Sequence, residues 1–303
     1  MFARLLLAAL AFCASAGAWA GIPTFCDRSN KINAEDQDRV LQFAAVAKQE
    51  LERSGARVAL IARAGLDLSR FKLLYSHAGI AIKESADGPW AVRQLYYACD
   101  ESRPRLFDQG MAGFTLGAET PARGHISLLF LPDAESALLE GAASDKRLAL
   151  ALLAGQYSAN AYAFSTRYQN CNQWVAELIA SAWGRFDGHD GDHDNTRKHA
   201  QAWLREQGYS AGPVKVPSHW MMFAGQFVPL VHVNDHPVDD IYALSLRVSV
   251  PASIEEFVHR RVPQTQRVEL CHDKSRIVVH RGWEQLGSDC TPMAGDEVIA
   301  LAR

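Results

Sequence analysis

The sequence predicts an α+β fold in which an antiparallel sheet packs against helices. Segments with helical periodicity and short apolar segments typical of strands are mixed along the chain. Two neighbouring strand-like segments are joined by the turn ESADGP at 84–89, which indicates a hairpin. No internal repeat or low-complexity linker divides the chain. We therefore expect one domain over residues 21–303, with a C-terminal hairpin extension from about residue 251.

The first half of the chain opens with a helix over 33–55. Asn33 can cap it, acidic residues fill its first turn, and Gly55 follows its end. A second helix is expected over 135–155, interrupted near Gly141. The strands expected in this half are 56–65, 71–83, 90–99 and 123–132, of which the second and third form the hairpin.

The second half contains a helix over 171–184, which Gly184 ends. A polar loop follows, and then a short helix over 196–208. Ser253 and Glu256 form a capping-box pattern, which predicts another short helix after a strand that begins near residue 241. A hairpin over 268–290 follows near the end of the chain.

The N-terminus has the pattern of a Sec-type signal peptide. Arg4 precedes an apolar run that ends in small residues at Ala18 and Ala20, so we expect cleavage after Ala20 and a periplasmic or secreted protein. No later stretch approaches eighteen apolar residues, so no stable membrane span is expected after cleavage. The net charge is −3 with interspersed charges, which argues against a nucleic-acid partner. The sequence does not indicate an oligomeric state.

The predicted mature chain has an odd number of cysteines. Cys271 and Cys290 flank the C-terminal hairpin and would pair easily, and Cys26 and Cys99 could then pair as well. Sequence alone does not fix this connectivity. That pairing would leave Cys171 as a single thiol, which in an oxidising compartment is either buried or used.

Cys171 lies at the start of the helix over 171–184. Asn170 is a natural N-cap, which places Cys171 on the first turn. There the helix dipole and the unpaired backbone N–H groups lower the pKa of a thiol and can stabilise an oxyanion. The apolar face of this helix also carries Cys171, so the thiol points towards the protein body; the face consists of Cys171, Trp174, Val175, Leu178 and Ala182.

A thiol nucleophile needs a base, and His77 has the most unusual setting of the eleven histidines. Strand alternation puts Gly79 and Ala81 on the same face as His77, so this face lacks bulk and we expect the Cys171 helix to dock on it. The next strand offers Gln94 or Arg93 to orient the imidazole. Gln94 is preferred, because a neutral amide accepts the ring N–H without burying a charge.

The segments SHAGIAIK (76–83) and NCNQWVAEL (170–178) resemble the circularly permuted branch of the papain-like, NlpC/P60-type thiol hydrolases and acyltransferases. In that branch a strand histidine comes first, a polar residue follows on the next strand, and a cysteine then opens a helix. The resemblance implies His77 as base, Cys171 as nucleophile and Gln94 as third residue, where relatives carry a second histidine. The whole chain further resembles an uncharacterised exported bacterial family, domain of unknown function 2145.

Other interpretations of these residues stay open. Cys171 could be a core thiol, and in the unpermuted papain-like order His232 and Asn234 would follow it as base and third residue. Tyr168 or Gln169 could donate to an oxyanion. The loop over 189–194 lacks the ligand spacing of a zinc or calcium site, so we expect a solvated acidic loop and no metal. Four tryptophans are expected in the core, namely Trp90, Trp174, Trp183 and Trp220.

The function expected from these features is a cysteine-dependent hydrolase or acyltransferase that acts on an amide, ester or thioester through an acyl-enzyme. No metal or organic cofactor is implied. Peptides, peptidoglycan stem peptides and lipid acyl groups all present suitable carbonyls. The alternative is a catalytically silent periplasmic binding or envelope-assembly module on the same scaffold. A redox thiol is a weaker third interpretation, because no C-x-x-C accompanies Cys171.

Overall fold

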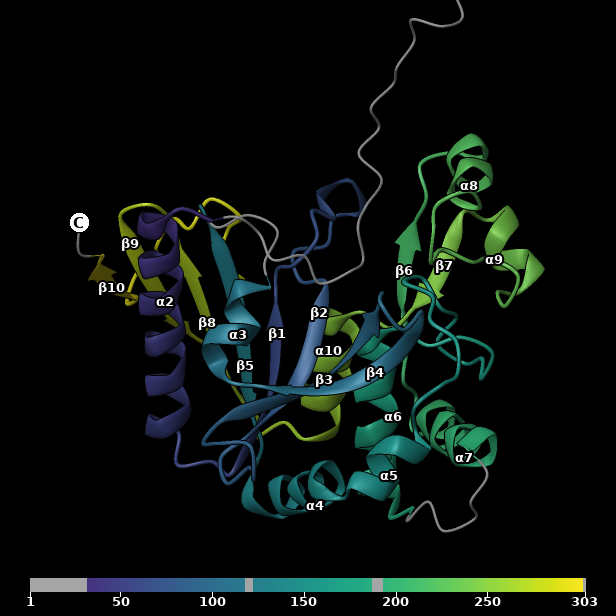
Figure 1. The fold of residues 1–303 in the computed structure, drawn as a ribbon, viewed down its shortest axis with the longest axis horizontal. Helices are drawn as coiled ribbons and strands as arrows, with labels where there is room; N and C mark the ends of the chain where they lie inside the picture. The colour runs from purple at the N-terminus through teal and green to yellow at the C-terminus, as the bar shows by residue number, and fades with distance from the viewer. Residues whose placement is uncertain (1–31, 118–121, 187–192, 302–303) are drawn as a thin grey trace, which may run out of the picture.

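The computed structural model describes residues 32–117, 122–186 and 193–301. An eight-stranded sheet forms its centre, with the strand order β10-β9-β8-β5-β1-β2-β3-β4, and every pairing is antiparallel (Figure 1). The α+β class with an antiparallel sheet is therefore confirmed. The strands are β1 Val58–Arg63, β2 His77–Ile82, β3 Ala91–Ala98, β4 Arg103–Gln109, β5 Gly124–Phe130, β8 Gln266–His272, β9 Arg276–Arg281 and β10 Glu297–Ala300.

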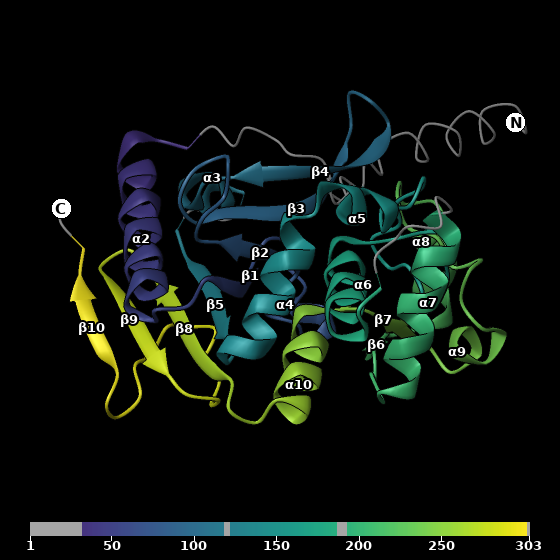
Figure 2. The ribbon, with the colours of Figure 1, turned by 90° about the horizontal axis from the view of Figure 1, so that it is seen from below.

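Helices cover both faces of this sheet, as Figures 1 and 2 show. One face carries α2 (Ala34–Arg53) and α3 (Met111–Leu116). The opposite face carries four helices, and α7 (His193–Glu206) packs outside them against α6. These four are α4 Asp133–Ser144, α5 Lys146–Ala151, α6 Cys171–Gly184 and α10 Pro251–Arg261.

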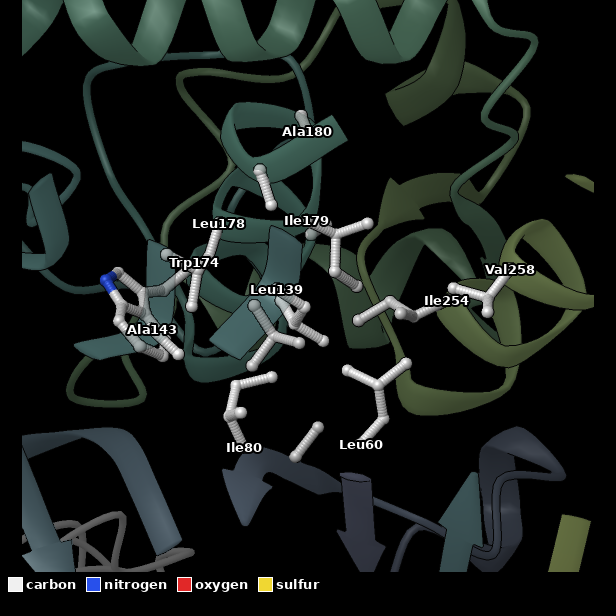
Figure 3. Packing of buried hydrophobic residues seen from close by; sticks show 14 of the residues in the cluster. Leu60, Ile80, Leu139, Ala143, Trp174, Leu178, Ile179, Ala180, Ile254 and Val258 are labelled. Atoms are coloured by element: carbon white, nitrogen blue, oxygen red, sulfur yellow. The ribbon is translucent and has the colours of Figure 1, made fainter. Parts of the chain in front are cut away.

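The central strand β1 is buried along its whole length because it separates two apolar cores. Ala59 and Ile61 face the α2 side, whereas Leu60 and its alternate neighbours face the α6 side. Figure 3 shows the second core, where Leu60 and Ile80 of the sheet meet Leu139 of α4 and several side chains of α6. Burial of this apolar area, at about 25 cal/mol per Å², is the main force that fixes α6 on the sheet.

A small lobe extends from the α6 side. It consists of the two-stranded sheet β6 (Gly212–Lys215) and β7 (Ser245–Val248), with α8 (His219–Gly225) and α9 (Val238–Tyr242) beside it (Figure 1). Trp220 on α8 is 74% exposed, so the expectation that it builds core is wrong. Trp90 and Trp174 are fully buried as expected, and Trp183 is half-buried.

Several element boundaries follow the sequence signals. Asn33 caps α2, because its Oδ1 accepts a hydrogen bond from the Asp36 N–H at 2.8 Å. The break in the helix after Pro132 falls at Asp145 and not near Gly141, because Asp145 caps α5 by accepting from the N–H groups of Arg147 and Leu148. Helix α10 begins at Pro251, so Ser253 is not its N-cap but bonds back to Val250 from the first turn.

The C-terminal strands continue the central sheet, because β8 pairs with β5 over seven residues. A disulfide joins Cys271 to Cys290, as expected from the hairpin, and it indicates an oxidising, extracytoplasmic environment. Cys99 is also disulfide-bonded, whereas Cys26 and the proposed signal peptide lie outside the described residues. Within the described ranges, no helix has the length and hydropathy that a membrane span requires.

Candidate active site

Cys171 is the first residue of α6, and Asn170 caps this helix as the sequence predicts. Oδ1 of Asn170 accepts from the Gln173 N–H at 2.7 Å, and its Nδ2 donates to the carbonyl oxygens of Ala159 and Ser249, both at 3.2 Å. The first bond caps the helix, and the other two fix its start to two loops. Cys171 is the free cysteine of the described residues, and it is 6% exposed.

The thiol of Cys171 lies against the backbone of β2. Its Sγ is 3.9 Å from the Ser76 carbonyl oxygen, and the Ala78 N–H donates to it. The N–H groups of Cys171 and Asn172, at the start of α6, also point at the sulfur. Because Ser76 and Ala78 flank His77 in the chain, the thiol contacts the strand on both sides of the histidine.

The imidazole of His77 is held by Gln94, its predicted partner on the next strand. Nε2 of His77 lies 2.8 Å from Oε1 of Gln94, while Nε2 of Gln94 donates to Oε1 of Gln109 at 2.8 Å. The alternative partner, Arg93, instead forms a bidentate ion pair with Asp108, with both N–O distances at 2.7 Å. Within the described part of the chain, no hydrogen bond joins the imidazole to the Cys171 thiol.

Burial controls the protonation of both groups. It lowers the pKa of His77 to about 3, and the nearby Arg63 guanidinium acts in the same direction, whereas the bond to Gln94 raises the pKa. Burial also raises the pKa of Cys171 to about 11, although the backbone N–H groups and Arg63 lower it. The sequence predicted a lowered pKa for Cys171, and this prediction is wrong, because burial outweighs the N–H groups of the helix start. At pH 7 the thiol and the imidazole are both neutral.

Helix α6 does not pack on the small-residue face of β2. Ala78 and Ile80 belong to the core that contains α6, whereas Ala81 belongs to the core on the α2 side. The face of β2 that carries Ala78 and Ile80 offers more apolar area, which explains why the apolar helix α6 packs there. A Cβ on Gly79 would lie 2.7 Å from Cγ1 of Val92 and 2.9 Å from the Arg93 carbonyl oxygen, so this glycine permits the close approach of β3.

Three side chains that lie around Cys171 and His77 were not identified from the sequence. Arg63 ends β1, and its Nη2 donates to the Tyr96 hydroxyl at 2.6 Å. The Tyr96 ring stacks on the His77 imidazole, with ring centroids 4.6 Å apart. The Tyr157 hydroxyl bonds to the Cys171 thiol. Of these, only Arg63 left a signal in the sequence, as a cation that ends the apolar run VALIA.

A buried ion pair supports the loop before Cys171. Nε of Arg197 on α7 lies 2.9 Å from Oε2 of Glu177 on α6, and both side chains are fully buried. Arg197 also donates to the carbonyl oxygens of Thr166 and Tyr168. Glu177 accepts further bonds from the amides of three glutamines, namely Gln169, Gln173 and Gln201. An acid inside an apolar helix was the signal for this network.

Other candidate residues have different contacts. The His232 ring stacks on Tyr168, with centroids 4.5 Å apart and planes 14° from parallel. Both Nε2 hydrogens of Gln169 point at protein acceptors, Leu152 O and Glu177, so this amide serves the buried network. Of the loop expected over 189–194, residues 189–192 lie outside the described residues, and the last two belong to the start of α7.

Within the described ranges, one group of side chains has ligand atoms close enough to bind a metal ion. The ligand atoms of His125, Cys271 and Cys290 lie within 4.8 Å of one another. The two cysteines form a disulfide, so they carry no thiolate with which to hold a metal. Nε2 of His125 lies 3.3 Å from the Gly287 carbonyl oxygen, which gives this buried imidazole a partner inside the protein.

The fold and the site define a mixed α+β protein with an eight-stranded antiparallel sheet and a buried thiol at a helix start. A family described as "Uncharacterized protein conserved in bacteria (DUF2145)" matches residues 50–258, more than half of the chain. The chain belongs to this family. Comparison with curated proteins gave no match, and comparison with solved structures gave none either.

Proposed function

We propose that the protein is a cysteine-dependent hydrolase or acyltransferase, with Cys171 as nucleophile and His77 as base. Two observations carry the proposal: the thiol contacts the backbone of Ser76 and Ala78, the residues that flank His77 in the chain, and Gln94 fixes Nε2 of His77. An amide oxygen only accepts hydrogen bonds, so Nε2 carries the proton and Nδ1 keeps the lone pair. A base in this tautomer can accept a proton from sulfur.

In the proposed reaction, Sγ attacks the carbonyl carbon of an amide, ester or thioester while its proton moves to Nδ1 of His77. Proton transfer accompanies attack, because a buried thiolate is unfavourable in the resting site. The imidazolium then protonates the leaving group, and an S-acyl enzyme remains. Water or an acceptor alcohol or amine, deprotonated by His77, then attacks the acyl group and releases Cys171 as a thiol.

Several donors near the sulfur suit the oxyanion of this reaction. The N–H groups of Cys171 and Ala78 point at the sulfur, and the Tyr157 hydroxyl bonds to it. Fixed donors that face developing negative charge supply a large share of the barrier reduction in acyl transfer, about 3 kcal/mol for one donor. These groups would bind the oxyanion once a substrate carbonyl reaches the thiol.

We also propose that the arrangement is the permuted papain-like one, in which the strand histidine precedes the helix cysteine. His77 on β2, Gln94 on β3 and Cys171 on α6 follow that order. Export through the N-terminal signal, with cleavage after Ala20, belongs to the same proposal. The disulfide between Cys271 and Cys290 supports it. Peptide, peptidoglycan and lipid acyl carbonyls are the substrate classes in view.

The test is acylation by p-nitrophenyl acetate, followed by mass spectrometry of the Cys171 peptide and by release of nitrophenolate. We expect acetylation at Cys171, its loss in Cys171→Ala, and a fall of at least about a hundredfold in rate in His77→Ala. His232→Ala is the matched control and should keep the wild-type rate, because its ring stacks on Tyr168. An equal rate in wild type and Cys171→Ala would rule out the proposal.

A second candidate function is the silent binding module, and the burial of the site favours it. Cys171 is 6% exposed, His77 7% and Gln94 0%, so no substrate reaches the thiol without movement. If this candidate is correct, p-nitrophenyl acetate leaves Cys171 unmodified in the folded protein and acetylates it only after denaturation.

A further inference from the structure

Arg63 is a buried cation with unsatisfied donors, close to the proposed active site. It is 4% exposed, and in the β1–β2 register its Cα lies opposite that of His77. Its Nη2 donates to Tyr96, but its Nε and Nη1 have no hydrogen-bond partner. Among residues 32–117, 122–186 and 193–301, no carboxylate forms an ion pair with it.

The other arginines that are buried in the described part of the chain are paired. Arg197 binds Glu177, Arg93 binds Asp108, and Arg267 lies 3.0 Å from Glu255 and 3.1 Å from Glu269. This pairing is expected, because an uncompensated charge in the interior costs several kcal/mol. Arg63 departs from the pattern, and a buried donor without an acceptor calls for a ligand or another explanation.

Within the described residues, the surroundings of the Arg63 guanidinium supply no negative charge. Its Cζ lies 5.4 Å from the centroid of the Phe114 ring, and the rings of His77 and Tyr96, which stack on one another, lie nearby. Two glycines complete the contacts, since a Cβ on Gly65 would lie 2.7 Å from Nη1 and one on Gly117 would lie 2.6 Å from Nη2. Both glycines and Tyr96 are half-buried, so the guanidinium lies one residue below the surface.

We propose that Arg63 binds an oxyanion, a carboxylate or phosphate group, of the molecule that enters this site. A guanidinium has five N–H donors and matches such groups in geometry and charge. This inference rests on the proposed function and specifies its substrate. The acyl compound would carry a negatively charged group near the carbonyl that Cys171 attacks. The adjacency of Arg63 and His77 in the sheet sets that short spacing.

Binding of small anions to the full chain tests the proposal without any chemistry at Cys171. The probes are sodium acetate and sodium phosphate, compared at equal ionic strength with sodium chloride and with neutral acetamide, by calorimetric titration. We expect acetate or phosphate to bind about tenfold or more tightly than acetamide, because hydrogen bonds between a guanidinium and an anion are stronger than those to a neutral acceptor. The better of the two anions identifies the source as a carboxylate or a phosphate compound.

Two variants locate the site. Arg63→Met should lose the preference for the anion, whereas Arg105→Met should keep it, since Arg105 is only half-buried on β4 and pairs with Glu101. Arg63→Lys keeps the charge without the planar fork and should bind the anion several-fold more weakly than wild type. The absence of an anion preference in wild type, or an unchanged preference in Arg63→Lys and Arg63→Met, would overturn the inference.

The outcome is separable from that of the acylation test. Cys171→Ser should bind acetate or phosphate as wild type does, because the anion contacts Arg63 and not the thiol. Anion binding without acylation would retain Arg63 as a ligand site and remove the proposed reaction. Acylation without anion binding would retain the reaction and remove the inference about the charge of its substrate.

Discussion

Nε2 of His77 and Oε1 of Gln94 lie 2.8 Å apart on neighbouring strands. This contact fixes the tautomer of the imidazole, because the amide oxygen has no proton to donate. Gln94 is itself oriented by Gln109, to which its Nε2 donates. The chain Gln109–Gln94–His77 therefore decides which imidazole nitrogen carries the lone pair.

The first prediction concerns the titration of His77. Its pKa of about 3 means that side-chain NMR should find the neutral Nε2–H tautomer from about pH 5 to 9. In Gln94→Glu the new carboxylate should raise the pKa of His77, because it favours the imidazolium. Titration of wild-type His77 near pH 6.5 would contradict the burial described above.

The same shift predicts a loss of stability in acid. The folded pKa of about 3 lies below the ordinary histidine value of 6.5, so the unfolded chain takes up the proton first as the pH falls. His77 therefore contributes stability above pH 6.5 that is lost between about pH 6.5 and 3, at no more than about 1.4 kcal/mol per pH unit. Urea unfolding of wild type and His77→Gln across this range measures the difference, since Gln does not titrate.

The second prediction concerns the reactivity of the Cys171 thiol. Because burial raises its pKa to about 11, the rate of alkylation by iodoacetamide in the native protein should rise about tenfold per pH unit through pH 9 without reaching a plateau. In the urea-unfolded protein the alkylation rate should level off at a pH just above the ordinary thiol pKa of about 8.5. Cys171→Ser supplies the blank. A native plateau at or below pH 8.5 would mean that the N–H groups of the helix start outweigh burial.

The third prediction compares two glycines. Gly79→Ala should destabilise the protein by about 1–3 kcal/mol, because the new methyl would lie 2.9 Å from the Arg93 carbonyl oxygen, which is backbone and cannot move alone. Gly141→Ala is the control in an exposed turn of α4 with no atom within 4 Å, and it should stabilise by up to about 1 kcal/mol. Denaturant midpoints of both variants measure the two changes in stability, and equal changes would contradict the prediction.

The fourth prediction concerns the buried pair of Glu177 and Arg197. Glu177→Gln leaves Arg197 without its counter-ion and should cost about 3–5 kcal/mol of unfolding free energy. Glu256→Gln breaks an exposed pair with Arg260 at 3.9 Å and should cost less than about 0.5 kcal/mol. Both are measured by urea unfolding. A small effect of Glu177→Gln would show that the loop before Cys171 is held by other contacts.

The sequence predicted features that depend on local signals. The caps Asn33 and Asn170 place two helix starts correctly, because an N-cap acts within three residues of its acceptor. The contact of Gln94 with His77 also followed from adjacent strands, which share a short turn. That these residues are catalytic stays a prediction.

Features that depend on distant segments could not be predicted in this way. The packing face of α6 depends on which side of β2 offers more apolar area once helices from both halves of the chain have folded. The raised pKa of Cys171 follows from the same burial, which no helix pattern reveals. The unpaired state of Arg63 depends on every segment around it. Sequence spacing carries no information about such contacts.

The boundaries of the family match have a practical consequence for the central sheet. The match ends at residue 258, whereas β8 begins at Gln266 and pairs with every residue of β5. A chain cut after residue 258 would lose three strands and leave the backbone of β5 as a new sheet edge. All seven residues of β5 are buried, so this edge would be long and apolar, and such edges recruit strands from other molecules. The shortened chain would therefore tend towards insoluble aggregates and not towards a smaller folded unit.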